Sequence, residues 1–186
     1  ALDVACHDLR VIACAAEAQL ARSDEAQLAR AQGKSGSKLE DAVRLLNKTF
    51  QSTVTDRAPL HSSKKWGALS VINNLFFLYF RLHNVRLCRN PLRAVDNAAF
   101  PPLDRFPISQ RVTFAYFRGR MALAEGAVTE AADNLRIAFE RQPHSAVQNK
   151  RRALTYLVPA RLSLGECPPP ALLEKYQLME YAGLAR

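Results

Sequence analysis

Small residues recur in one stretch of the chain at spacings that constrain its fold. Gly119, Ala131, Ala138 and Pro143 follow one another at intervals of 12, 7 and 5 residues, and Gly126 lies between the first two. Two antiparallel helices approach closely where small side chains face each other, and a glycine after the first helix supports the turn. The spacing therefore predicts a tightly packed helix pair over residues 108–124 and 127–141, closed by Pro143.

This spacing is typical of the helix-turn-helix repeat of about 34 residues known as the tetratricopeptide type. In that repeat a small residue on the first helix faces a small residue on the second, and a proline ends the unit. Leu135 and Phe139 are then expected to fill the groove beside Ala138. Helix pairs of this kind stack into α-solenoids, which usually bind other macromolecules. An ordinary antiparallel helix pair is the alternative interpretation.

Helical apolar spacing extends over most of the remaining chain, and no segment reads as a credible strand. Further helices are expected over 2–31, 66–80, 143–164 and 171–176, and within 83–99. Another helix is expected to begin after Ser37 and to end before a loop at 56–63. We expect Ser37 to cap the second helix, with Glu40 completing a capping box. Pro159 is expected to bend its helix, and the proline-rich run 100–107 to connect two halves. The fold class is therefore predicted to be all-α.

The segment 66–80 is the most apolar run in the chain. It has 15 residues, fewer than the roughly 20 that a membrane span needs, and two asparagines interrupt it. We therefore predict the most buried helix of a bundle and no membrane association. Its aromatic residues, Trp66, Phe76, Phe77, Tyr79 and Phe80, are expected to pack in the core rather than to stack on nucleobases.

Catalytic and metal-binding patterns are missing from the sequence. The four cysteines lie far apart, without a C-x-x-C pair or a histidine at zinc-ligand spacing, and are interpreted as reduced thiols of an intracellular protein. No nucleophile elbow, phosphate-binding loop, dinucleotide fingerprint or metalloprotease motif occurs. Although catalytic groups can also be assembled in space, we expect no enzyme activity, no cofactor and no metal ion.

The formal charge of +9 is unevenly distributed. Residues 1–63 are neutral, with eight basic and eight acidic residues, whereas residues 81–120 hold eight arginines against two aspartates. Residues 141–161 add five basic residues and no acid, and an acidic helix lies between the two basic segments. This pattern indicates either separate contact surfaces or internal ion pairing.

Two groups of cations are candidate contact residues. Arg86, Arg89 and Arg93 share one face if the segment is helical, and such a stripe can neutralise phosphates or bind an acidic protein. A solvated basic face is the alternative, and Pro91 within the stripe leaves its register open. Successive residues on a helix point about 100° apart, so Lys150, Arg151 and Arg152 cannot all share one face. We expect one or two of them to contact Glu140 or Asp133, and Arg111 and Arg118 to extend either surface.

Five segments together resemble the PCI-domain family, in particular its subunit of the nuclear mRNA-export complex that couples transcription to export. They are SKKWG (63–67), LCRNPLRAVDN (87–97), QRVTFAYFRGR (110–120), NKRRALTYLVPARLSLG (149–165) and LLEKYQLMEYA (172–182). The resemblance spans residues 37–186. A paralogous PCI protein associated with the signalosome shares much of the pattern and stays as an alternative.

The resemblance implies a non-catalytic scaffold, a right-handed superhelix of tetratricopeptide-like helix pairs. It implies an N-terminal helix and linker over 1–36 and the helical-repeat part of a PCI domain over 37–186, with the family's winged helix absent from this chain. The implied partners are a larger PCI scaffold and a small acidic protein, with RNA or DNA bound weakly by this part alone. A nuclear location is implied, with the cytoplasm as a further compartment. A tetratricopeptide-like adaptor that binds a peptide in its concave groove is the alternative from another class.

Overall fold

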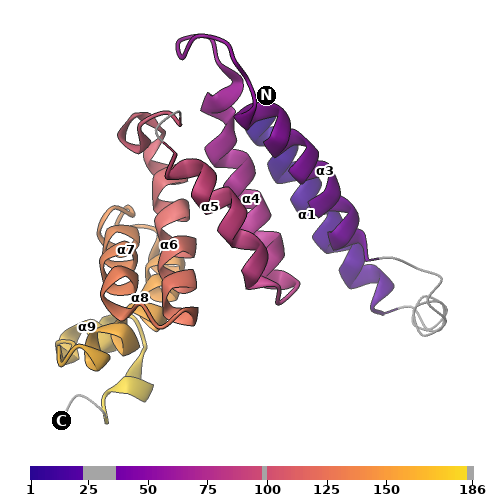
Figure 1. Cartoon of the computed structure of the whole chain (residues 1–186). Helices are drawn as coiled ribbons and strands as arrows, with labels where there is room; N and C mark the ends of the chain where they lie inside the picture. The colour runs from indigo at the N-terminus through magenta and orange to yellow at the C-terminus, as the bar shows by residue number, and fades with distance from the viewer. Residues whose placement is uncertain (23–36, 98–99, 184–186) are drawn as a thin grey trace. The chain divides into compact units, whose positions relative to one another are not determined.

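A computed structural model describes residues 1–22, 37–97 and 100–183 of the chain (Figure 1). Across those residues it contains eight α-helices and no strand, which confirms the all-α prediction. The chain forms two compact units, Ala1–Arg105 and Phe106–Arg186. The boundary falls within the predicted proline-rich connector at 100–107. The predicted division at residue 36 and the right-handed superhelix stay predictions.

The first unit is built around the apolar helix α4 (Ala68–Arg81). Helix α1 (Leu2–Leu20) packs against both α3 (Lys38–Val54) and α4, and α3 also packs against α4 (Figure 1). Apart from Phe77, which is half-buried, the apolar side chains of α4 between Leu69 and Leu78 are almost completely removed from solvent. Burial of these side chains provides the main stabilisation of this unit and confirms that the 66–80 run is a core helix.

Short 3₁₀ helices flank α4 and refine the predicted boundaries. Residues Lys64–Gly67 form the 3₁₀ helix η1, so α4 begins two residues after the predicted start. After α4 come η2 (Val85–Cys88), α5 (Arg89–Val95) and η3 (Leu103–Arg105). The predicted helix over 2–31 is confirmed as far as Leu20, where a turn follows, and its residues 23–31 lie outside the described part of the chain.

The predicted capping box at the start of α3 is wrong. Ser37 makes no side-chain bond to the first turn, and its hydroxyl instead donates to Oε1 of Glu17 on α1 at 3.3 Å. The other carboxylate oxygen of Glu17 accepts the backbone N–H of Lys38 at 2.9 Å. A carboxylate at a helix N-terminus satisfies a free N–H and interacts favourably with the helix dipole. The cap of α3 therefore comes from a neighbouring helix.

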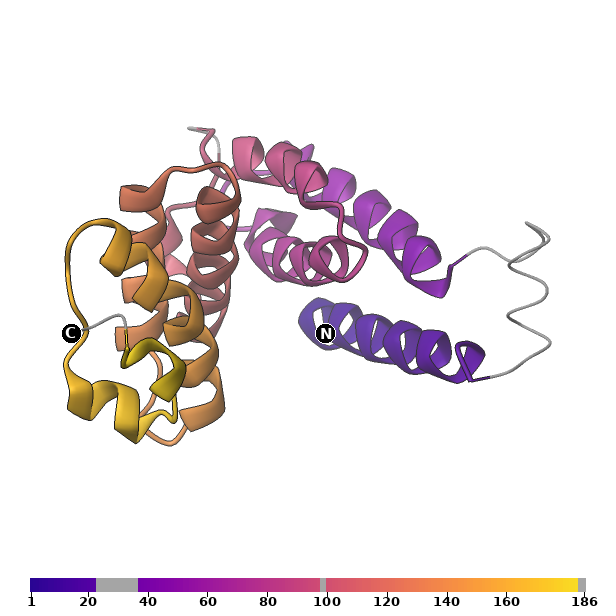
Figure 2. The ribbon, with the colours of Figure 1, turned by 90° about the horizontal axis from the view of Figure 1, so that it is seen from below.

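The second unit contains the predicted helix pair. Helix α6 (Ile108–Ala124) packs along α7 (Val128–Glu140), and Ala131 and Ala138 are fully buried between the helices of this unit (Figure 2). A Cβ atom added at Gly119 would lie 2.6 Å from Cγ of Leu135 and 3.1 Å from the carbonyl oxygen of Ala131. Only glycine fits at this contact, so the predicted register of the pair is confirmed.

The turn between α6 and α7 also follows the prediction. Gly126 adopts a φ of 79°, a left-handed conformation that glycine enters without steric cost. Its N–H donates to the carbonyl of Leu123 at 3.1 Å, and the N–H of Ala127 donates to the carbonyl of Ala122 at 2.9 Å. These bonds end α6 by satisfying its last carbonyl groups. Helix α7 ends three residues before Pro143, as expected of a closing proline.

Helix α8 (Val147–Ser163) completes the core of the second unit together with α9 (Pro170–Lys175) and η4 (Met179–Tyr181). Leu135 of α7 packs there with Leu154, Leu157 and Val158 of α8 and with Leu173 of α9. Helix α8 continues through Pro159 to Ser163. The bend expected at Pro159 stays a prediction.

Candidate interaction surfaces

Arg86, Arg89 and Arg93 lie on an exposed edge of the first unit, but not on one continuous α-helix. Arg86 belongs to the 3₁₀ helix η2, and α5 begins at Arg89, so α-helical spacing applies to Arg89 and Arg93 alone. All three side chains are exposed, while Pro91 and Val95 on the other side of α5 are buried. This edge, which we call the α5 basic edge, can offer three guanidinium groups to phosphates or carboxylates.

Lys150 does not belong to an exposed basic surface, and the prediction is corrected at this residue. The residue is 4% exposed, and its Nζ donates to the carbonyl of Phe139, in the last turn of α7, at 2.7 Å. The Nζ also lies 4.5 Å from the centroid of the Phe139 ring. Burial lowers the pKa of Lys150, the charge of Lys175 lowers it further, and Glu140 opposes the shift. The ammonium group therefore holds α7 and α8 together instead of facing a partner.

Arg151 and Arg152 are both exposed on α8, as expected for part of the basic triplet. A guanidinium nitrogen of Arg151 donates to the carbonyl of Gln177 at 3.2 Å. Of the contacts expected for this triplet, Glu140 acts electrostatically on Lys150, and both Glu140 and Asp133 also pair with Arg136 of their own helix. The short i, i+3 and i, i+4 spacing on α7 favours that local pairing.

Arg118 forms an ion pair at the surface of the helix pair. Its Nε lies 3.0 Å from Oε1 of Glu130, which joins α6 to α7 across the surface of the unit. The Arg118 side chain retains 28% exposure. Arg111, two turns before Arg118 on the same helix, is half-buried. Both residues are therefore less accessible to a partner than the sequence suggested, whereas the Arg152 side chain is exposed.

Sequence reasoning missed a second group of side chains, in which Arg120 lies between two tyrosine rings. Its guanidinium carbon is 4.6 Å from the ring centroid of Tyr156 on α8 and 5.4 Å from that of Tyr116 on α6. The two ring centroids are 6.0 Å apart in an edge-to-face arrangement. Burial raises the pKa of Tyr116, while the charges of Arg120 and Arg152 oppose that shift, so Arg152 also acts on this group. The sequence signal was the four-residue spacing within each helix.

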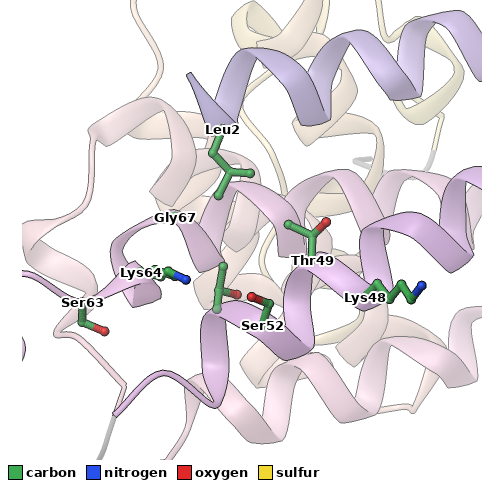
Figure 3. A pocket seen from close by; sticks show the side chains of 8 residues that line it. Leu2, Lys48, Thr49, Ser52, Ser63, Lys64 and Gly67 are labelled. Atoms are coloured by element: carbon green, nitrogen blue, oxygen red, sulfur yellow. The ribbon is translucent and has the colours of Figure 1, made fainter. Parts of the chain in front are cut away.

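A hollow of about 610 Å³ opens in the first unit between α1, α3 and η1 (Figure 3). Its lining residues are Leu2, Lys48, Thr49, Ser52, Thr53, Ser63, Lys64 and Gly67. Figure 3 shows Lys48 and Lys64 at opposite ends, with Leu2 and Ser52 between them. The hydroxyl of Ser63 donates to the carboxylate of Asp56, and that of Thr49 to its own helix. None of these described lining residues is a histidine, a cysteine or an acidic residue.

Neither a metal centre nor a membrane-spanning helix is found in the described part of the chain. Its histidine, cysteine and acidic side chains form no group of three that could hold a metal ion. None of its helices is both long enough and apolar enough to cross a membrane. What these residues present is a set of pairwise-packed α-helices with basic groups on their surfaces.

Comparison with known proteins identifies the family of the chain. No family model matches the chain. It is 37% identical over 180 residues to PCI domain-containing protein 2 of Xenopus laevis, covering 96% of this chain and 43% of the relative. It is 38% identical over 149 residues to the PCI domain-containing protein 2 homolog of Dictyostelium discoideum (79% of this chain, 35% of the relative). It is also 41% identical over 138 residues to the protein CSN12 homolog of Mycosarcoma maydis (74% and 30%).

The chain belongs to the family of PCI domain-containing protein 2 and CSN12 homologues. It spans less than half of the length of these relatives. Its described helices represent one part of the family architecture, and the predicted resemblance to PCI proteins is confirmed.

Proposed function

We propose that this chain is the helical-repeat part of a non-catalytic scaffold subunit in a nuclear mRNA-export complex. The observation that supports this most is the similarity to PCI domain-containing protein 2 over 96% of the chain. The tightly packed α6–α7 pair agrees with that assignment, because stacked helix pairs present extended surfaces without catalytic groups. Residues 37–186 would form the repeat part and residues 1–36 an additional helix and linker.

The scaffold would act through two kinds of surface. Exposed cations of the α5 basic edge, together with Arg151 and Arg152, would contact an acidic protein or the phosphates of RNA or DNA. The ends of the helical stack would contact a larger PCI-domain scaffold protein through apolar packing. The exposed apolar side chains Val4, Val11 and Ile12 on α1 support such an end contact.

Affinity purification tests the choice of complex. The tagged parent protein would be recovered from nuclear and cytoplasmic fractions of its own cells, and the bound proteins identified by quantitative mass spectrometry. Enrichment of a large PCI scaffold, a small acidic protein and export factors in the nuclear fraction is the expected result. Recovery of subunits of the proteolysis machinery without export factors would reject the export assignment.

The RNA contact can be tested with the chain itself. Binding of a short single-stranded RNA is measured over a range of salt concentrations, with and without the triple substitution of Arg86, Arg89 and Arg93 by glutamate. We expect affinity to fall steeply with salt and to be lost in the triple variant, because each phosphate contact releases counterions.

A matched variant controls for net charge in this RNA assay. Replacing the exposed residues Lys38, Arg44 and Arg57 of the same unit by glutamate changes the total charge equally. Equal loss of binding in both triple variants would show that only net charge matters. Absence of binding by the unmodified chain would assign this segment to protein contacts alone.

The similarity to CSN12 homologues supports one second candidate, a PCI subunit associated with the signalosome. The purification experiment separates this candidate from the export subunit, since the two predict different co-purifying complexes. A peptide-binding adaptor of the tetratricopeptide type is the remaining alternative. It would be favoured if the Arg86, Arg89 and Arg93 triple variant kept all of its partners while substitutions on the first helices of the pairs abolished binding.

A further inference from the structure

We propose that Ser37 is a phosphorylation site, and that a phosphate on this serine releases helix α1 from the first unit. The inference goes beyond the proposed scaffold function and does not depend on which complex the chain joins. It rests on two features of the first unit: the sparse packing of α1, and the contact that Glu17 of this helix makes with Ser37.

Helix α1 is held in place by few buried side chains. Within this helix Cys6 and Ala13 are the buried residues, and both are small. The larger apolar side chains Val4, Val11 and Ile12 are exposed. Burial of apolar surface is the main source of docking free energy, and elements that bury little of it open most readily. The attachment of α1 therefore depends strongly on its polar contacts.

Polar contacts attach α1 near both of its ends. Near the N-terminus, the hydroxyl of Ser70 on α4 donates to a carboxylate oxygen of Asp3. Near the C-terminus, the carboxylate of Glu17 accepts the hydroxyl of Ser37 at 3.3 Å and the backbone N–H of Lys38 at 2.9 Å. Ser37 is the N-cap residue of α3. One carboxylate therefore both caps α3 and fastens the end of α1 to it.

A phosphate on Ser37 would compete with Glu17 for the N-terminus of α3. It carries a charge of about −1.5 to −2 at neutral pH and has three acceptor oxygens. The modified Oγ has no proton to donate to Glu17, and the two adjacent anions repel each other. The phosphate can itself accept the free N–H groups of the first turn, where the helix dipole favours an anion. We therefore expect α3 to remain capped and Glu17 to lose its two bonds to this turn.

The described charges beside Ser37 favour release of α1 over formation of a new ion pair. Glu40 and Asp41 lie in the first turn of α3, and the ammonium of Lys38 is already 3.8 Å from Asp41. A phosphate placed among carboxylates disrupts contacts by like-charge repulsion. The two acids also follow Ser37 by three and four residues in the sequence. A protein kinase with a basic peptide-binding cleft would select this serine, because its cations bind carboxylates.

The modification itself is a phosphoryl transfer from ATP. The Oγ of Ser37 forms a bond to the γ-phosphorus while the bond from that phosphorus to the β-phosphate oxygen breaks, so that ADP leaves. The hydroxyl proton passes to a carboxylate base of the kinase. Ser37 has an extended backbone, with φ of −67° and ψ of 132°, and is half-buried. The kinase would therefore act on chains in which α1 has opened, and the phosphate would hold them open.

Release of α1 would also change the surface offered to partners. Val4, Val11 and Ile12, which are proposed above to contact a larger PCI scaffold, lie on this helix and would lose their fixed position. This consequence rests on the proposed function, whereas the release of α1 does not.

The native cysteines can report on the release. Cys6 of α1 is 4% exposed and Cys88 of η2 is fully buried, whereas Cys167 of the second unit is exposed. A thiol reacts as its thiolate and only when reagent reaches it. Burial raises the pKa of Cys6, and the charge of Asp3 raises it further, so the docked thiol is protonated as well as covered. Reaction at Cys6 therefore requires opening of α1.

The full chain, with either serine or genetically encoded phosphoserine at position 37, is treated with iodoacetamide. Mass spectrometry then gives the rate of reaction at each cysteine. We expect phosphorylation to increase the rate at Cys6 about ten- to hundredfold, because a bond to a charged group is lost and a repulsion is gained. The rates at Cys88 and Cys167 should stay nearly unchanged.

Three control variants identify the cause of the change. Phosphoserine in place of Ser109, an exposed serine in the first turn of α6, adds the same charge to the other unit and should not affect Cys6. In Glu17→Gln, phosphorylation of Ser37 should change the Cys6 rate much less, because the amide is uncharged. In Glu17→Arg, phosphorylation should slow the reaction, since phosphate and guanidinium attract each other.

Four outcomes would overturn the proposal. An unchanged Cys6 rate would show that α1 does not depend on this contact, and equal acceleration at Cys6 and Cys88 would indicate unfolding of the whole unit. An equally large effect of the phosphate in Glu17→Gln would show that it does not act through Glu17. Failure of a purified acidophilic kinase with ATP to modify Ser37 in the full chain would reject the site. Each outcome is compatible with normal co-purification of export factors, which tests the proposed function separately.

Discussion

Replacing Ala131 by leucine is expected to destabilise the second unit, because the contact that it enters has no free volume. Ala131 is completely buried, and even one Cβ atom at the facing Gly119 would come within 3.1 Å of the Ala131 carbonyl oxygen. A larger side chain at such a contact forces the helices apart or twists neighbouring side chains, at a cost of about 1 to 3 kcal/mol. Helix propensity changes little between alanine and leucine, so overpacking dominates.

The free energy of unfolding is measured by urea titration with far-UV circular dichroism. The only tryptophan, Trp66, lies in the first unit, so its fluorescence does not report directly on the substituted helix pair. For a chain of this size the expected loss corresponds to a fall in melting temperature of about 2 to 12 °C. Ala124→Leu, at the exposed last residue of α6, is the matched control and should change stability by less than about 0.5 kcal/mol.

A double-mutant cycle adds a test of the contact itself. Gly119→Ala gains about 1 kcal/mol of helix propensity but brings its methyl group to 2.6 Å from Leu135 Cγ. Because Gly119 and Ala131 share one contact, the effects of the two substitutions should be non-additive by about 0.5 kcal/mol or more. An Ala131→Leu variant as stable as the Ala124→Leu control would refute the register of the helix pair.

Three further predictions concern polar contacts. Glu17→Ala should destabilise the first unit by about 1 kcal/mol, whereas Ser37→Ala should have little effect, and urea titration of both variants distinguishes this interhelical cap from a capping box. Lys150→Met should lower the free energy of unfolding by about 1 to 3 kcal/mol, since it leaves a helix-end carbonyl unsatisfied. The unfolding of this variant should therefore be followed by circular dichroism before any loss of its RNA binding is interpreted. The pKa of Asp56 is held below its usual value by hydrogen bonds from backbone N–H groups, first that of Lys64. Its contribution to the free energy of unfolding is therefore fully present above the unfolded pKa of about 3.9 and is lost as pH falls through the folded pKa. Between neutral and acid pH, stability should therefore fall less in Asp56→Asn than in the unmodified chain.

Local patterns in the sequence were sufficient to predict the helical architecture and one close contact. Helix positions follow from apolar spacing and from helix-ending residues, both of which act over a few neighbours. The approach of Gly119 to Ala131 was predictable for a related reason, because facing helices can meet only where small residues recur at matching positions. The burial of residues 66–80 was predictable since a segment that is apolar on all sides must be covered.

The candidate sites were predicted less well, because their chemistry depends on contacts between separate elements. The sequence identified basic residues in 141–161, but only the packing of α8 on α7 made Lys150 a buried donor and left Arg152 exposed. Likewise, only the tertiary contact of α1 with α3 assigns Glu17 as a cap, and only the contact of α6 with α8 places Arg120 between two rings. A sequence by itself determines charge and helical periodicity. The tertiary structure decides which charged groups lose water and which partner they meet, since both depend on atoms brought together from distant parts of the chain.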